Sequence, residues 1–206
     1  MSMRYLTQGE KENSRRLYEC CFPEDSQKFV DYYYQEKCRE NEIAVIEENG
    51  KIISMVHANP FTVSCCGTQA EVHYIVAVAT DPEYRRRGYM RQLMQQVLRD
   101  CRNRGEVFSF LMPADPAYYE PLGYRYWNNQ YVWEIPKEQE LLLKGFCQNP
   151  EYQSDADPKA LAQMADRILA DQFDLYILRN ASYYERIKKE QKSEDGDVVC
   201  LYDRNG

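Results

Sequence analysis

The strongest chemical signal in this sequence of 206 residues is a run of three arginines and a glycine, Arg85–Gly88. Residues 72–79 before it are almost continuously apolar, which predicts a strand buried on both faces. After Gly88, apolar residues recur every three or four positions, which predicts an amphipathic helix. The free N–H groups and the dipole at a helix start attract anions, and a glycine lets the backbone approach closely. The pattern therefore predicts a phosphate site, and a pyrophosphate suits it best.

A second apolar run, 108–112, leads into a segment that contains Tyr119 and ends in Leu122-Gly123-Tyr124. Together the two segments resemble the GNAT superfamily of N-acetyltransferases, and the likeness is closest to its Eis-like (enhanced intracellular survival) branch. Arg85–Met90 correspond to the family's loop that holds the pyrophosphate of acetyl-CoA, although Met90 stands where that loop prefers a small residue. Tyr119 stands at the place of the family's tyrosine. The resemblance covers about residues 1–135.

The resemblance implies a GNAT acyl-CoA N-acyltransferase fold of the α/β (α+β) class, with a mixed central sheet flanked by helices, and acetyl-CoA as cofactor. The expected function is acetyl transfer to a primary amine by direct attack in a ternary complex. Tyr119 is expected to be catalytic, because a tyrosine with an ordinary pKa near 10 is protonated at neutral pH and can give its proton to the departing thiolate. The alternative for Tyr119 is aromatic packing. The expected cofactor-binding residues are Val76, Val78, Arg85, Arg86, Arg87, Gly88, Tyr89, Met90 and Arg91.

The acceptor amine has a pKa near 10.4 and must lose a proton before it attacks. The candidate bases are Glu71, His73, Glu24 and Asp25, and none of them stands out. A histidine inside a mostly apolar strand, such as His73, is more often a core or edge residue whose hydrogen bonds are satisfied. The resemblance places the loop between the first two helices at the acceptor site, so that Glu24, Asp25 and Tyr33 are expected substrate contacts. The alternative for the run 32–34 is that one tyrosine faces the core and the others cover the surface.

The composition limits the classes of partner that we expect for this chain. A formal net charge of −7 argues against nucleic acid and suits a small cationic amine. The first residues lack an apolar signal core and no stretch reaches membrane-spanning length, so we expect a cytoplasmic protein without a membrane partner. The eight cysteines are expected to be reduced, and since Cys20-Cys21 and Cys65-Cys66 lack zinc-motif spacing, no metal is expected. The sequence leaves open whether the chain forms a homo-oligomer.

The remaining patterns give the expected order of elements. A strand at 4–7, helices at 10–21 and 26–39, and a hairpin of strands 43–47 and 51–57 around Asn49-Gly50 come first. A strand near Val63, the strand and helix that flank the arginines, a strand at 107–112 and a helix carrying Tyr119 follow. Residues 126–135 are expected to close the sheet.

The C-terminal part repeats the front of the chain. Helices are expected at 159–170 and 182–191, and 199–206 lines up with 43–50, ending in the same Asn-Gly pair. We therefore expect a GNAT domain at 1–136, a linker at 137–157 and an incomplete second GNAT-like domain at 158–206. Two other functions stay open: an acyl-CoA-binding module without catalysis, and a fragment that needs further C-terminal domains for activity.

Overall fold

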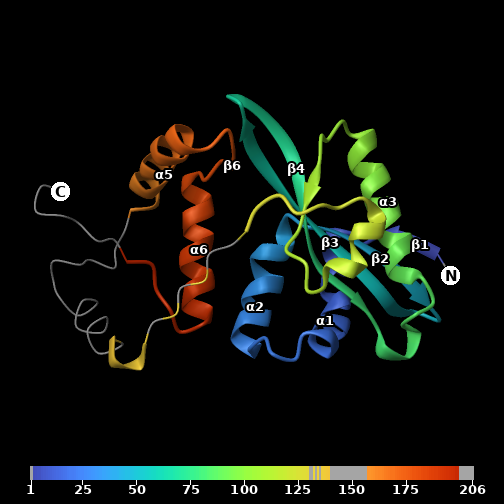
Figure 1. The fold of residues 1–206 in the computed structure, drawn as a ribbon. Helices are drawn as coiled ribbons and strands as arrows, with labels where there is room; N and C mark the ends of the chain where they lie inside the picture. Colours follow the sequence, from blue (N-terminus) through green and yellow to red (C-terminus); the bar gives the residue numbers. More distant parts are fainter. Residues whose placement is uncertain (1, 130–131, 133, 135, 140–156, 200–206) are drawn as a thin grey trace, which may run out of the picture. The chain divides into compact units, whose positions relative to one another are not determined.

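The computed structural model describes residues 2–129, 132, 134, 136–139 and 157–199. The chain divides into two compact units. The first contains Met1–Tyr124 and Ile168–Leu178, and the second contains Arg125–Arg167 and Arg179–Gly206. All of the expected site residues belong to the first unit, which is a sheet with helices on both faces (Figure 1).

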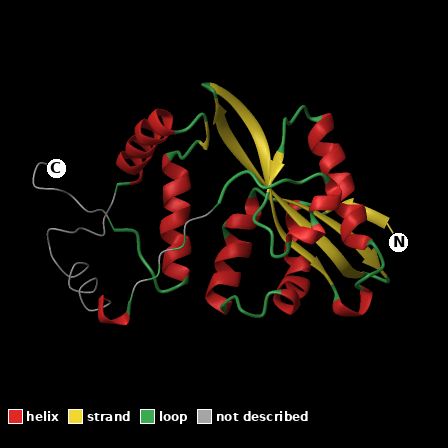
Figure 2. Ribbon diagram, viewed as in Figure 1, coloured by secondary structure: helices red, strands yellow, loops and turns green. Residues whose placement is uncertain are grey.

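The sheet of the first unit is mixed. Strands β1 (Ser2–Tyr5), β2 (Glu42–Glu48), β3 (Lys51–Cys65) and β4 (Thr68–Thr80) pair antiparallel in sequence order, and β5 (Ser109–Phe110) pairs parallel to β4. Figure 2 shows β3 and β4 as the two long strands, which extend together beyond the rest of the sheet. At that end, β6 (Leu175–Ile177) pairs antiparallel with Val63–Cys65 of β3.

Two apolar clusters lie on opposite faces of the sheet. On one face, α1 (Arg15–Cys21) and α2 (Gln27–Gln35) contribute Leu17, Tyr18 and Val30. On the other face, α3 (Tyr89–Asn103) contributes Leu93, Met94 and Val97, which are at most 1% exposed. This arrangement confirms the expected fold class and the expected apolar stripe on the helix after Gly88.

Several elements differ in extent from the expectation. The helix expected at 10–21 begins as a 3-10 helix, η1 (Gln8–Ser14), and becomes α-helical only at Arg15. The strand near Val63 is the continuation of β3. Tyr119 lies between two 3-10 turns, η4 (Pro116–Tyr118) and η5 (Glu120–Leu122), because Pro121 lacks the backbone N–H that a continuous helix would need at that position. The described residues among 126–135 form no strand, and the others of that range lie outside the described part.

The C-terminal part contains α5 (Pro158–Gln172) and α6 (Ala181–Ser193), close to the expected bounds. The strand β6 between them was not expected from the sequence. The repeat expected at 199–206 lies almost wholly outside the described residues. None of the described helices combines the length and the apolar character that crossing a membrane requires.

Candidate active site

The arginine loop, Arg85–Gly88, joins the 3-10 turn η3 (Pro82–Tyr84) to α3. Gly88 is the N-cap residue of α3, with φ +83°, and it supplies no side chain to cap the helix. The first N–H groups of a helix have no acceptor within the helix, so those of α3 face outward at its positive end. Arg86 also has a positive φ of 62°, which turns the chain sharply just before the helix.

The arginines divide into two kinds. The Nε of Arg85 donates to the Thr80 carbonyl at 3.1 Å, and Nη2 of Arg87 donates to the Glu83 carbonyl at 3.0 Å. The Arg87 guanidinium also lies 5.0 Å from the Tyr84 ring centroid. By contrast, Arg86 and Arg91 are exposed and make no hydrogen bond or ion pair with the described residues. Arg85 and Arg87 therefore brace the loop, whereas Arg86 and Arg91 are available to an anion.

A buried aspartate anchors the turn before the loop. Asp81 accepts from the Glu83 backbone N–H at 3.1 Å, and its second oxygen lies 2.6 Å from the Lys51 ammonium. The hydrogen bond from Lys51 lowers the pKa of Asp81, so the pair is ionised at neutral pH. We did not single out Lys51 or Asp81 from the sequence, although Asp81-Pro82 is an N-cap signal for a short helical turn.

Strand β4 has an open edge beside this loop. Its pairing with β5 is confined to His73–Ser109 and Tyr74–Phe110, so that on this side Ile75–Thr80 pair with no strand among the described residues. Val76 and Val78 lie in this open stretch. Its unpaired backbone groups can hydrogen-bond to an extended amide-bearing chain such as the pantetheine arm of CoA.

A β-bulge changes which way the β4 side chains point. The register of β3 and β4 shifts between Met55 and His57, and Ala77 opposite has φ +48°. As a result, Val76 and Ala77 both pack on the α1/α2 face, while Val78 packs on the α3 face. The structure thus separates the side chains of Val76 and Val78, which simple alternation would place together. The apolar sequence of β4 contains no glycine or other signal for this bulge.

Tyr119 is half-buried in the cluster on the α3 face, which also includes Met90, Leu122 and Tyr124. Burial raises its pKa, with smaller contributions from Tyr74 and Tyr118. Its hydroxyl has no hydrogen-bond partner among the described residues, whereas the neighbouring Tyr124 hydroxyl lies 2.7 Å from Ser109 Oγ. Tyr118 is 62% exposed. Tyr119 is therefore protonated at neutral pH, close to Tyr74 where the β4 edge opens, and free to donate.

The loop between α1 and α2 presents two carboxylates. Glu24 is exposed, and Asp25 is half-buried and accepts a hydrogen bond from the Tyr18 hydroxyl at 2.7 Å. Tyr33, the third expected acceptor contact, is instead a core residue, 4% exposed. Its hydroxyl lies 2.9 Å from His57 Nδ1 and accepts from Asn41 Nδ2 at 3.2 Å. Tyr32 and Tyr34 are also buried, so the alternative, in which one tyrosine faces the core and the other two cover the surface, is wrong as well.

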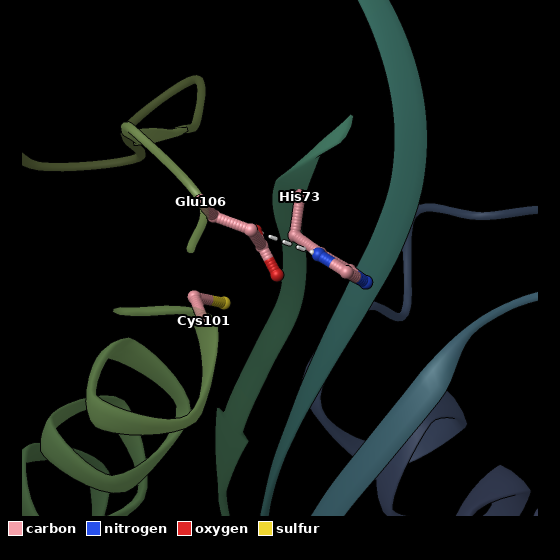
Figure 3. Close-up of side chains that lie close together, drawn as sticks. All are labelled: His73, Cys101 and Glu106. Carbon is pink, nitrogen blue, oxygen red and sulfur yellow. Dashed lines mark hydrogen bonds and ion pairs between the residues drawn. The ribbon is translucent and has the colours of Figure 1, made fainter. Parts of the chain in front are cut away.

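The other two candidate bases lie away from the arginine loop. Glu71 is exposed, and its carboxylate accepts from Thr62 Oγ1 at 2.6 Å. His73 is 7% exposed, and its Nδ1 lies 2.9 Å from a Glu106 carboxylate oxygen (Figure 3). His73 is thus a buried histidine with a partner, the alternative weighed from the sequence.

Comparison with known proteins assigns the chain to a family. Residues 2–127 match the family described as "Acetyltransferase (GNAT) domain". The chain belongs to this GNAT family. A search of curated proteins found none that matches.

Solved structures of GNAT proteins share the fold at low identity. A probable N-acyltransferase from Enterococcus faecalis has a TM-score of 0.55 and 21% identity over 59% of this chain and 31% of its own. The match therefore spans about a third of that protein. A GNAT family acetyltransferase from Brucella melitensis, solved with acetyl-CoA, has a TM-score of 0.52 and 19% identity over 61% of this chain and 82% of its own. Glucosamine-6-phosphate N-acetyltransferase from Arabidopsis thaliana has a TM-score of 0.52 and 17% identity over 66% of this chain and 98% of its own.

Proposed function

We propose that this GNAT protein transfers an acetyl group from acetyl-CoA to a primary amine of a small, cationic acceptor. The observation that carries the proposal is one continuous arrangement in the first unit. The start of α3, with Arg86 and Arg91, leads to the β4 edge, and that edge lies close to the half-buried Tyr119 hydroxyl. Within the part of the chain that the structure describes, the two arginines, the Ile75–Thr80 edge and this hydroxyl have no partner. The Brucella relative's complex with acetyl-CoA supports the choice of cofactor.

In this proposal the pyrophosphate of acetyl-CoA binds at the start of α3, where Arg86 and Arg91 add charge-assisted contacts to the backbone N–H groups. The pantetheine arm lies along the open edge of β4. Gly88 is required there because its positive φ is costly for any residue with a Cβ. The larger Met90 is accommodated because it points into the α3 cluster.

The acyl transfer itself is direct. The nitrogen of the deprotonated amine attacks the thioester carbonyl carbon, the C–S bond breaks, and the sulfur takes the proton of the Tyr119 hydroxyl. The proton released by the amine returns to Tyr119 through solvent. Burial raises the pKa of Tyr119, so its hydroxyl is protonated at neutral pH and can supply this proton as the C–S bond breaks.

The acceptor is proposed to be cationic because the α1–α2 loop presents Glu24 and Asp25 and the chain carries a net charge of −7. The Arabidopsis relative is named for an amino-sugar substrate, which supports an amine acceptor. We propose further that the chain belongs to the Eis-like branch and that 158–206 is the start of a second GNAT-like domain joined by a linker at 137–157. The pairing of β6 with β3 would then join the second domain's first segment to the sheet of the first.

The test compares Tyr119→Phe with Tyr118→Phe in single-turnover measurements of thiol release with an amine acceptor. General acid catalysis contributes about 10²–10⁴-fold, so Tyr119→Phe should slow release by a factor in that range without weakening acetyl-CoA binding. Tyr118→Phe should have little effect because its side chain is exposed. Equal, mild losses in both variants would reject the acid role.

Met90 favours one other function, a non-catalytic acyl-CoA-binding module, since it departs from the small residue of the family pattern. Acetyl-CoA binding without thiol release for any amine would select that function. Activity that appears only in a longer chain would instead show that further domains are needed.

A further inference from the structure

A second group of reactive side chains lies at the other end of α3 from the arginine loop. His73 of β4, Cys101 of α3 and Glu106 after α3 each place one ligand atom within 4.8 Å of the other two (Figure 3). Gly88 and Cys101 are thirteen positions apart on one helix, which separates the two sites by about 20 Å at 1.5 Å per residue. The cluster is therefore distinct from the proposed acetyl-CoA site.

The end of α3 fixes two of these residues relative to each other. The N–H of Glu106 donates to the Cys101 carbonyl at 3.1 Å, and the N–H of Gly105 donates to the Arg102 carbonyl at 3.0 Å. With Gly105 at φ +86°, these bonds form a Schellman motif. The backbone thus holds Cys101 and Glu106 side by side, and β4 brings His73 to the same place.

A positively charged side chain lies against the cluster. The Arg104 guanidinium donates to Glu106 Oε1 at 2.9 Å and to Cys101 Sγ at 3.4 Å, and it lies 3.2 Å from a Glu42 carboxylate oxygen. The Arg104 side chain is 39% exposed, so it can leave Cys101 and Glu106 while it keeps Glu42. Arg104 therefore occupies the place that a bound cation would take.

We propose that His73, Cys101 and Glu106 bind a borderline-soft divalent cation of the Zn²⁺ class. Imidazole nitrogen, thiolate sulfur and carboxylate oxygen are the three protein ligands that Zn²⁺ prefers. The cation takes the position of the proton between His73 Nδ1 and Glu106, whose atoms are already 2.9 Å apart. That proton passes through solvent to Nε2, so the imidazole stays neutral, and the Cys101 sulfur moves closer to complete a three-ligand site. Binding releases the Cys101 thiol proton and displaces Arg104.

A cavity adjoins two of the three ligands, His73 and Glu106. A pocket of about 490 Å³ is lined by His73, Glu106, Arg104 and Glu71, among other residues of the first unit. Zinc sites with three protein ligands leave a position for water or a ligand, whereas structural sites usually have four. The geometry thus favours an open site. No zinc motif is visible in the sequence because the three ligands come from a strand, a helix and a turn.

Titration with Co²⁺ tests the proposal, because a thiolate ligand gives cobalt a near-ultraviolet charge-transfer absorption. The full chain should take up one equivalent with this absorption, and excess Zn²⁺ should abolish it. Cys101→Ser should remove the absorption, and His73→Gln or Glu106→Gln should weaken binding by more than the roughly 10–100-fold typical of outer-shell changes. The double variant Cys65→Ser, Cys66→Ser is the matched control and should behave as the original protein.

A further variant separates metal binding from damage to the fold. Arg104→Gln removes the competing charge from a partly exposed position, so it should bind Co²⁺ roughly 10-fold more tightly. Weaker or unchanged binding in Arg104→Gln would overturn the proposal. So would absorption that persists in Cys101→Ser but disappears in the Cys65, Cys66 control, or the failure of Co²⁺ to bind at all.

Discussion

Arg86 provides the sharpest test of the cofactor site. It is exposed and makes no hydrogen bond or ion pair with the described residues, so its replacement by alanine should break no polar contact within that part of the chain. A hydrogen bond to a charged group contributes about 1.5–3 kcal/mol, and solvent screening at an exposed position favours the lower end. At about 1.4 kcal/mol per factor of ten, Arg86→Ala should weaken CoA binding roughly 10-fold.

Isothermal titration calorimetry with CoA and with pantetheine measures this effect. Arg86→Ala should weaken the binding of CoA and of acetyl-CoA by the same factor, because both carry the pyrophosphate. The affinity for pantetheine, which lacks the pyrophosphate, should not change. The control is Arg99→Ala, which removes an exposed arginine within α3 whose Nη2 donates to Gln96. If Arg86→Ala and Arg99→Ala had the same effect on CoA affinity, the arginine loop would not be the pyrophosphate site.

Two predictions concern stability and domain organisation. Burial lowers the pKa of His57 to about 3. As the pH decreases, His57 is therefore protonated near pH 6.5 in the unfolded chain but only near pH 3 in the folded chain. The free energy of unfolding should therefore fall by about 1.4 kcal/mol per pH unit as the pH decreases between these values. Chemical denaturation at several pH values measures this slope, and His57→Gln should make it shallower. A slope that is the same in His57→Gln would contradict the prediction. Limited proteolysis should cut the chain first between Pro136 and Pro158. The N-terminal fragment should still bind CoA, since both apolar clusters lie within residues 3–124. Loss of CoA binding after this cut would show that the later segment is part of the site.

The sequence predicted the parts of the fold that depend on local pattern. The apolar run before Arg85 is β4, the three-to-four periodicity after Gly88 is α3, and Asn49-Gly50 is the turn between β2 and β3. In each case the residues that set the local conformation are also those that pack. Hydrophobic period and turn chemistry therefore suffice for these elements.

The features that the sequence did not reveal depend on contacts between distant segments. The bulge at Ala77 has no local signal, and Tyr33 is buried because His57 and Asn41, from elsewhere in the chain, pair with its hydroxyl. The cluster of His73, Cys101 and Glu106 forms only when β4 meets the end of α3. The short strand β6 forms because it pairs with the edge of β3, and its own sequence pattern does not predict a strand.

The most direct test of the proposed function is to follow acetyl-CoA, the full chain and a panel of primary amines by thiol release and by intact mass of both product and protein. Direct transfer in a ternary complex predicts that thiol is released only when an amine is present, with one acetylated amine for each thiol and no acetylated protein. Thiol release without an amine, an acetyl group on the protein that later passes to the amine, or no release with any amine would contradict the account.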